Sequence, residues 1–338
     1  MQSAELGRSG IVTSIVGLGG GGPSRFGLST GSRPAEAIAL IRRARDLGVT
    51  FFDGSGLIGG VDEVLGEAVK PFRRDVVLST KVNLAPAIWP LDRNRTLHRA
   101  AARAAGALSL VASSAAIRTH VERTLRQLAT DTIDILHLHA VAPGQFDDAV
   151  KKAVPVLEAL KREGKVRAIG VTELFSGDPR HEMLARAIDD GFADVVMTGL
   201  NLLNASARDA VIPAATAREI GVIAMFAVGR TLRSETGLAA ALSASGVADA
   251  AERAASFMRT LRENGVERLT DAAYRFCRHE RGVAVTLIGT GNIVHLEENI
   301  AAAAAPPLPP SVVQAIRALA ADQSATFGGA GAGRTSKR

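Results

Sequence analysis

Cysteine and aromatic residues are scarce in this chain of 338 residues. Cys277 is the only cysteine, which excludes an internal disulfide framework and any metal site built from cysteines alone. We expect no metal site of another kind either. Aromatic residues make up 4% of the chain, with one tryptophan, Trp89, and one tyrosine, Tyr274.

Long apolar runs are also missing. No run reaches the ~18 residues of a membrane span, and the N-terminus lacks the charged-then-apolar pattern of a signal peptide. This pattern favours a cytoplasmic globular protein without a membrane partner. The net charge of +6 comes from scattered basic residues and a basic tail, not from basic patches interleaved with aromatics. We therefore expect no nucleic-acid partner, and nothing in the pattern indicates an oligomeric state.

Short apolar strands alternate with helices of apolar periodicity along most of the chain. Strands are expected at residues 14–18, 49–53, 75–81, 133–139, 166–171, 193–197, 222–226 and 284–288. Helices are expected between them, at residues 34–47, 61–70, 113–128, 147–163, 179–190, 206–219, 269–281 and 293–305. The alternation predicts a (β/α)8 TIM-type barrel, and a doubly wound parallel sheet is the alternative.

The predicted barrel is a single domain of residues 1–322. The two longest connections, residues 82–112 and 227–266, are expected to be specificity loops, because connections of that length are usually functional or disordered. They consist mainly of alanine, leucine and arginine. Residues 323–338 form a basic, glycine-rich tail that we expect to be disordered.

Three polar residues stand where buried strands end. Asp53 closes an apolar run and is followed by a glycine cluster, Lys81 ends the next strand, and His139 ends the one after that. Catalytic residues of such barrels lie at the C-terminal ends of strands, so these three are the candidate catalytic residues. His137 shares a strand face with His139 but lies further inside, where a core histidine with satisfied hydrogen bonds is the expected role. Residues 19–22 are all glycine, and we interpret them as a plain loop rather than a phosphate-binding one.

The chain resembles the aldo-keto reductase family from about residue 10 to about residue 320. The matching segments are residues 48–53 (GVTFFD), 78–81 (LSTK), 131–139 (DTIDILHLH), 160–171 (LKREGKVRAIGV), 288–292 (IGTGN) and 296–299 (LEEN). The resemblance implies a nicotinamide cofactor extended across the strand C-termini and hydride transfer to or from a small carbonyl or alcohol. It also implies a tetrad of Asp, Tyr, Lys and His, in which the tyrosine donates the proton.

The sequence departs from the family at the tyrosine. Five residues after Asp53 the family has tyrosine, but this chain has Ile58, which can neither donate nor accept a proton. Tyr274 belongs to the helix predicted at 269–281, far from the strand ends by topology. Because Asp53, Lys81 and His139 are all retained, an altered reaction is favoured over a dead enzyme.

Two classes of function follow from this departure. The first is an atypical NAD(P)-dependent oxidoreductase that uses His139 or water as proton donor, while Lys81 polarises the substrate oxygen. The second is a non-redox lyase, dehydratase or isomerase on the same barrel, with Lys81 as base or electrophile, Asp53 setting its charge and His139 as acid. A third hypothesis, a binding protein that senses the cofactor, has no positive support in the sequence.

The resemblance also implies where the cofactor binds. The positions fall after the fifth, seventh and eighth strands, and the last group opens a helix, whose N-terminus favours a phosphate. The lysine and arginine that usually select the 2′-phosphate are replaced by Gly289 and His295, so NADP and NAD both remain open. The implied contacts are Thr172, Glu173, Met225, Arg230, Gly289, Thr290, Asn292, Glu298 and Asn299.

Overall fold

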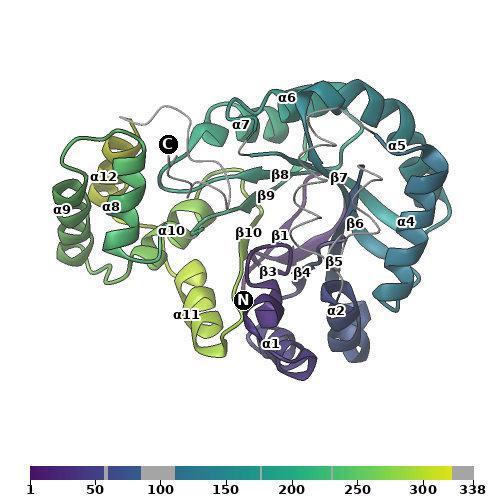
Figure 1. Cartoon of the computed structure of the whole chain (residues 1–338), viewed down its shortest axis with the longest axis horizontal. Coiled ribbons are helices and arrows are strands. Elements are labelled where there is room, and N and C mark those ends of the chain that lie inside the picture. Colours follow the sequence, from purple (N-terminus) through teal and green to yellow (C-terminus); the bar gives the residue numbers. More distant parts are fainter. Residues whose placement is uncertain (57–59, 85–110, 176, 230, 322–338) are drawn as a thin grey trace, which may run out of the picture.

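Eight parallel strands close into a barrel in the computed structural model (Figure 1), which describes residues 1–56, 60–84, 111–175, 177–229 and 231–321. Their order around the barrel is β10-β3-β4-β5-β6-β7-β8-β9. The strands are β3 (Val16–Gly19), β4 (Phe51–Asp53), β5 (Val77–Asn83), β6 (Ile133–Val141), β7 (Val166–Glu173), β8 (Val195–Gly199), β9 (Gly221–Met225) and β10 (Val285–Ile288). The predicted (β/α)8 barrel is confirmed, and the doubly wound alternative is wrong because the sheet has no open edge.

Helices follow the strands and pack outside them (Figure 1). They are α1 (Pro34–Asp46), α2 (Val61–Val69), α4 (Ser114–Gln127), α5 (Phe146–Arg162), α6 (Glu182–Asp190), α7 (Val211–Ala217), α10 (Leu269–Arg278) and α11 (Ile293–Ala304). Local signals set several of their starts: Pro34 occupies the first turn of α1, and the Ser113 hydroxyl accepts from the Ala116 N–H at 3.3 Å to cap α4.

The barrel has two apolar layers because side chains alternate along each strand. One layer lies between the strands and the helices. The other fills the barrel interior, and nearly every strand contributes to it. The interior cluster consists of Leu6, Ile11, Phe51, Val77, Ile135, Ala168, Val195, Met197, Ile223 and Val285. By the same alternation, Asp53, Ser79, Lys81, His137 and His139 lie on the interior face, above this cluster.

A hairpin closes the amino end of the barrel. Strand β1 (Ser3–Glu5) pairs antiparallel with β2 (Val12–Ser14), and Leu6 and Ile11, between the two strands, belong to the interior cluster. Gly7 forms a bridge with Ile220, which ties the hairpin to the base of β9. The polar residues of the interior therefore lie towards the opposite, carboxyl end.

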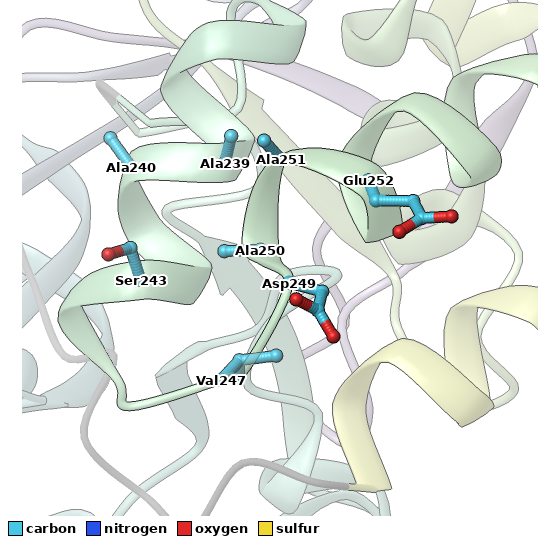
Figure 2. A pocket seen from close by; sticks show the side chains of 8 residues that line it. All are labelled: Ala239, Ala240, Ser243, Val247, Asp249, Ala250, Ala251 and Glu252. Atoms are coloured by element: carbon cyan, nitrogen blue, oxygen red, sulfur yellow. The ribbon is translucent and has the colours of Figure 1, made fainter.

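The segment 227–266 contains two helices, α8 (Glu235–Ala244) and α9 (Ala250–Glu263). They pack against each other, and α9 also contacts α12 (Pro310–Ala321), so that the three form a group beside the barrel (Figure 1). A hollow of about 580 Å³ lies at the turn between α8 and α9 (Figure 2). Four of its eight lining residues are alanine, Asp249 and Glu252 lie at one side, and it includes none of the predicted site residues.

The other predicted specificity loop, residues 82–112, lies largely outside the described residues. Ile58, Arg230 and the tail at 323–338 also lie outside them. The two ends of the loop are described, and there the Ala112 N–H donates to the Leu84 carbonyl at 2.6 Å.

No helix in the described part of the chain is long and apolar enough to cross a membrane. The described residues also contain no group of three or more His, Cys, Asp or Glu side chains placed to hold a metal ion.

Candidate active site

A buried ion pair joins the end of β4 to β5, two residues before β5 ends. The Lys81 Nζ atom lies 2.6 Å from both Asp53 Oδ1 and Oδ2, and the two residues are 5% and 2% exposed. The Ser79 hydroxyl donates a further hydrogen bond of 2.9 Å to Asp53 Oδ1. The carboxylate is thus held by two neighbours from β5, which fixes its orientation beneath the barrel mouth.

The Lys81 ammonium has a partner for each of its donors. Besides the two carboxylate oxygens, it donates to the Gly54 carbonyl at 2.8 Å. An ammonium has three N–H donors, so this set uses them all. Glycines crowd the pair from two sides: a Cβ on Gly21 would lie 3.7 Å from Nζ, and one on Gly56, where φ is +61°, would lie 1.7 Å from the Lys81 carbonyl oxygen. Gly56 is therefore the glycine that the ion pair requires, whereas a Cβ on Gly21 would be in ordinary van der Waals contact.

Asp62, from the first turn of α2, fixes the loop that follows Asp53. Its two carboxylate oxygens accept from the N–H groups of Ser55 at 3.0 Å and Gly56 at 2.8 Å. Burial raises the pKa of the Asp62 carboxyl to about 6, although the two backbone donors and the charge of Lys81 lower it. Sequence reasoning missed this residue, because an acidic residue in a first turn is usually a solvated helix-start signal.

We expect Asp62 to make the protein less stable as the pH rises from about 4 to about 6. The carboxyl titrates near 3.8 when unperturbed and near 6 when folded, so the folded state holds more protons in this window. Stability falls with pH wherever the folded state holds more protons, here by a few kcal/mol, on the order of 3. Urea unfolding of the wild type and of Asp62→Asn, which does not titrate, measures the effect. Parallel pH profiles of the two proteins would contradict it.

His139 lies two residues before the end of β6 and is partly exposed. The expected strand ends at His139 and Lys81 are therefore wrong by two residues, because β6 runs on to Val141 and β5 to Asn83. The pairing of β6 with β7 shifts register between Leu138 and Val141, so that two residues of β6, His139 and Ala140, face Thr172 alone. This is a β-bulge, a feature that re-aims side chains next to functional sites. The Thr172 hydroxyl oxygen accepts from the Ala140 N–H at 2.8 Å and lies 3.4 Å from His139 Nδ1.

His137 lies one step deeper in the barrel. It is fully buried, its strand partner is Lys81, and neither ring nitrogen has a hydrogen-bond partner among the described residues. The expected burial is confirmed, but the expectation that its hydrogen bonds are satisfied is wrong for the described residues. Burial holds the pKa of His137 well below its ordinary range, and the charges of Lys81 and His139 lower it further. A Cβ on Gly170 would lie 2.2 Å from His137 Nδ1, so the glycine makes room for the ring.

Glu173, at the end of β7, is fully engaged by neighbours. One carboxylate oxygen accepts from the Thr198 hydroxyl at 2.9 Å and the Gly199 N–H at 2.7 Å, and the other lies 2.6 Å from His181 Nδ1. The His181 Nε2 atom is in turn 2.8 Å from the Ser206 hydroxyl. The network ties the ends of β7 and β8 to the turn at Ser206–Arg208. Sequence reasoning missed His181, which precedes α6 in a left-handed conformation.

Met225, at the end of β9, packs against the interior cluster at the barrel axis. The next residue, Phe226, has a φ of +66°, which is unusual for a bulky side chain. Its ring stacks on that of Phe175, with centroids 5.8 Å apart and planes at 16°. An aromatic pair that sequence reasoning did not single out therefore lies beside Met225 and the Glu173 network.

The start of α11 has the features of an anion-binding site. Asn292 caps the helix by accepting from the His295 N–H at 3.1 Å, and Thr290 Oγ1 accepts from the Asn292 N–H at 3.1 Å. Among the described residues, the N–H groups of Ile293 and Val294 have no hydrogen-bond partner. Free first-turn N–H groups and the positive end of the helix dipole favour a phosphate. The space beside Gly289 is open, because a Cβ there would meet only the Gly19 carbonyl, at 3.7 Å.

Charged residues lie beside the second turn of α11. Glu298, half-exposed, forms an ion pair with Arg268, which also binds Asp271 at 3.0 Å. Asn299 lies behind it and is largely buried. The Arg268 guanidinium is therefore already neutralised by two carboxylates.

Tyr274 is closer to the strand ends than its helix suggested. It is buried in α10, and burial raises the pKa of its phenol above its ordinary range, while Arg233 and a hydrogen bond from the Gly289 backbone lower it. Gly289 directly follows β10. The expectation that Tyr274 lies far from all strand ends is thus wrong, because its long side chain spans the layer between helix and barrel.

The predicted residues on the strands lie towards the carboxyl end of the barrel, whereas Glu298 and Asn299 lie in the second turn of α11. Asp53, Lys81 and His139 come from three adjacent strands, and Lys81 and Asp53 are in direct contact. Thr172 and Glu173 follow on the next strand, and the residues around Thr290 lie across the barrel mouth, after β10.

This chain belongs to the Aldo/keto reductase family, which matches residues 16–321. L-galactose dehydrogenase of Arabidopsis thaliana is 28% identical over 309 residues, which cover 89% of this chain and 88% of the relative. The NADH-specific methylglyoxal reductase of Escherichia coli (strain K12) is 27% identical over 230 residues, covering 66% of this chain and 65% of the relative. The aldo-keto reductase AKR11C1 of Bacillus halodurans, solved in its holo form, shares the fold with a TM-score of 0.71 at 22% identity, covering 94% of this chain and 96% of the other.

The family membership confirms the resemblance found in the sequence motifs. It makes the chain a member of a family of oxidoreductases, and aldo-keto reductases use NAD(P)H. The open, glycine-lined start of α11 fits a phosphate of such a nucleotide.

Proposed function

We propose that the protein is an NAD(P)-dependent oxidoreductase that acts on a small carbonyl or alcohol and exchanges the proton through His139. One observation carries this proposal. All three donors of the buried Lys81 ammonium are occupied by Asp53 and Gly54, whereas His139, on the adjacent strand, is partly exposed. With Ile58 in place of the family's tyrosine, His139 is then the titratable group best placed to reach a substrate oxygen.

In this proposal the Lys81–Asp53 pair acts on the substrate through its electrostatic field, without direct contact. Lys81 would stabilise negative charge that develops on the substrate oxygen, as preorganised cations do in sites closed to water. Direct polarisation by Lys81 would require it to release one of its three present hydrogen bonds. His139 would donate its proton during reduction and accept one during oxidation.

The cofactor would lie across the barrel mouth. The bound nucleotide supplies or accepts the hydride; the residues of this chain hold it in place. Gly289, Thr290 and Asn292 would hold phosphate at the start of α11, and Glu298 and Asn299 the adenosine. Met225 and Arg230 remain proposed contacts of the nicotinamide half and the pyrophosphate. Thr172 and Glu173 are weaker candidates, because their polar atoms already bind neighbours.

We further propose little selection between NAD(H) and NADP(H). A 2′-phosphate needs an unpaired cation, and Arg268 near this region is paired with Glu298 and Asp271. The NADH-specific relative is consistent with a site that works without the 2′-phosphate. For substrates, the relatives suggest starting with L-galactose and methylglyoxal.

The non-redox alternative receives no support from the site. As a base, Lys81 would need a free lone pair, and an ammonium that donates three hydrogen bonds has none. As an electrophile, it would have to release one of these three hydrogen bonds to reach the substrate.

The test starts with the nucleotides and the wild type. Titration calorimetry with NAD, NADH, NADP and NADPH should give comparable heats for both pairs, and turnover of the two substrates is followed by nicotinamide absorbance. Ile58→Tyr should then raise reduction of generic aldehydes, by up to about 10²-fold, because it restores the phenolic acid that the family has at this position. The larger ring should also slow the native reaction.

Ile58→Phe is the matched control, since it adds the ring without the hydroxyl. It should slow the native reaction and leave generic aldehyde reduction unimproved. Absence of heat with every nucleotide at millimolar concentration would refute the oxidoreductase proposal. If Ile58→Phe and Ile58→Tyr increased generic aldehyde reduction equally, the hydroxyl would not be what the site lacks, and the role of a missing acid would be refuted.

A further inference from the structure

The β6 bulge leaves one backbone group that needs a partner. Ala140 adopts a left-handed conformation, with φ of +49°, which costs a residue with a Cβ on the order of 1 kcal/mol. In this conformation its N–H does not join the β6–β7 ladder, and the Thr172 hydroxyl oxygen accepts it at 2.8 Å. The side chain of Thr172 thus takes the place of a ladder carbonyl, and a strained backbone turn depends on it.

The same hydroxyl determines what His139 Nδ1 can do. Thr172 is 1% exposed, and its oxygen already accepts from Ala140. Its own O–H must donate, because a buried donor left without an acceptor costs about 1–3 kcal/mol. In the described part of the chain, His139 Nδ1, at 3.4 Å, is the acceptor within reach. A neutral imidazole that accepts at Nδ1 carries its proton on Nε2.

From this geometry we infer that Thr172 is a positioning residue that fixes His139 in the Nε2–H tautomer, so that Nε2 faces the substrate oxygen as the donor. The inference rests on the proposed role of His139 and deepens it. The bulge and Thr172 act together: the extra residue re-aims the ring, and the threonine hydroxyl holds both the re-aimed backbone and the ring nitrogen. The assignment differs from the cofactor contact that the family resemblance implied for this position.

The test compares Thr172→Val with Thr172→Ser. Valine keeps the shape and removes the hydroxyl, whereas serine keeps the hydroxyl. In protein labelled with ¹⁵N at histidine, two-dimensional spectra that connect ring nitrogens to ring protons report the tautomer of His139, whose signal is identified by its loss in His139→Gln. We expect the Nε2–H form in the wild type and in Thr172→Ser, and a shift towards the Nδ1–H form in Thr172→Val.

Kinetics provide a second readout that a purely structural role would not produce. Thr172→Val should lower kcat for carbonyl reduction by at least about tenfold and change its pH profile, because misplacing the donor proton removes part of a general-acid effect worth about 10²–10⁴. KM and the Kd of NADH should stay unchanged, and Thr172→Ser should restore kcat. A cofactor-binding role would instead raise the Kd of NADH.

Two outcomes overturn the inference while leaving the proposed function standing. One is a wild type with His139 in the Nδ1–H form; the other is Thr172→Val with unchanged tautomer and unchanged kcat. Failure of the proposed function looks different, because then His139→Gln itself retains full turnover. Thermal unfolding of all variants shows whether Thr172→Val has lost activity by misfolding or by mispositioning His139. If Thr172→Val is unstable, adding Ala140→Gly, which relieves the left-handed strain, should restore the stability of that variant without restoring its kcat.

Discussion

Replacing Lys81 with methionine should lower turnover by about 10²–10³-fold and lower the free energy of unfolding by about 3–5 kcal/mol. The activity is lost because the field that stabilises a developing oxyanion disappears. The stability is lost because Asp53, 2% exposed, loses its counterion, and among the described residues the Ser79 hydroxyl is its remaining side-chain partner. Urea unfolding and steady-state turnover measure the two effects separately.

The double variant Asp53→Asn/Lys81→Met is the control for that result. It removes both charges, and replacing a buried ion pair with neutral groups is often close to neutral for stability. We expect it to unfold at nearly the wild-type urea concentration while its turnover stays as low as that of Lys81→Met. A single variant as stable as the wild type would mean that water reaches Asp53 and that the pair is not sealed as the structure has it.

Two histidines of β6, two residues apart, should give opposite results. His139→Gln should lower turnover by about 10²–10⁴-fold, the usual worth of a positioned general acid. Its side chain is partly exposed near the strand end, so the free energy of unfolding should change by less than about 0.5 kcal/mol. Turnover with NADH and the melting temperature of the holoprotein test both parts.

His137→Leu should do the reverse. Neither nitrogen of the buried ring has a partner among the described residues, so a leucine of similar size removes an unsatisfied polar group and should leave stability unchanged or raise it by about 1–3 kcal/mol. Turnover should stay near the wild-type value. A large loss of turnover in His137→Leu, with His139→Gln still active, would exchange the roles assigned to the two residues.

The sequence predicts the barrel well because its strands are short, apolar and regularly spaced. The polar residues that interrupt these runs predict where the strands approach their carboxyl ends: β4 does end at Asp53, whereas β5 and β6 run two residues past Lys81 and His139. The packing of these residues could not be predicted. That Lys81 uses all three of its donors depends on the Gly54 carbonyl, whose direction follows from a loop that Asp62 holds from the next helix.

Helix starts show a similar limit. The helix predicted at 206–219 is a single turn followed by α7, because Pro213 has no N–H and its ring excludes the carbonyl of Asp209 from a continuous helix. The helix predicted at 179–190 begins instead at Glu182, where the Asp178 carboxylate accepts from the N–H groups of Glu182 and Met183. Glu173 could not be understood from sequence at all, since its partners come from two later segments.

The closure of the sheet has a consequence for how the protein is made. Strand β3 lies between β4 and β10, and Val16 pairs with Thr286 near the other end of the chain. While the chain leaves the ribosome, one edge of β3 therefore stays unpaired until almost all of the protein has been synthesised. Contacts between such distant segments form slowly, and an exposed strand edge invites pairing with other chains. We therefore expect nascent chains to be prone to aggregation until β10 has been synthesised and can pair with β3.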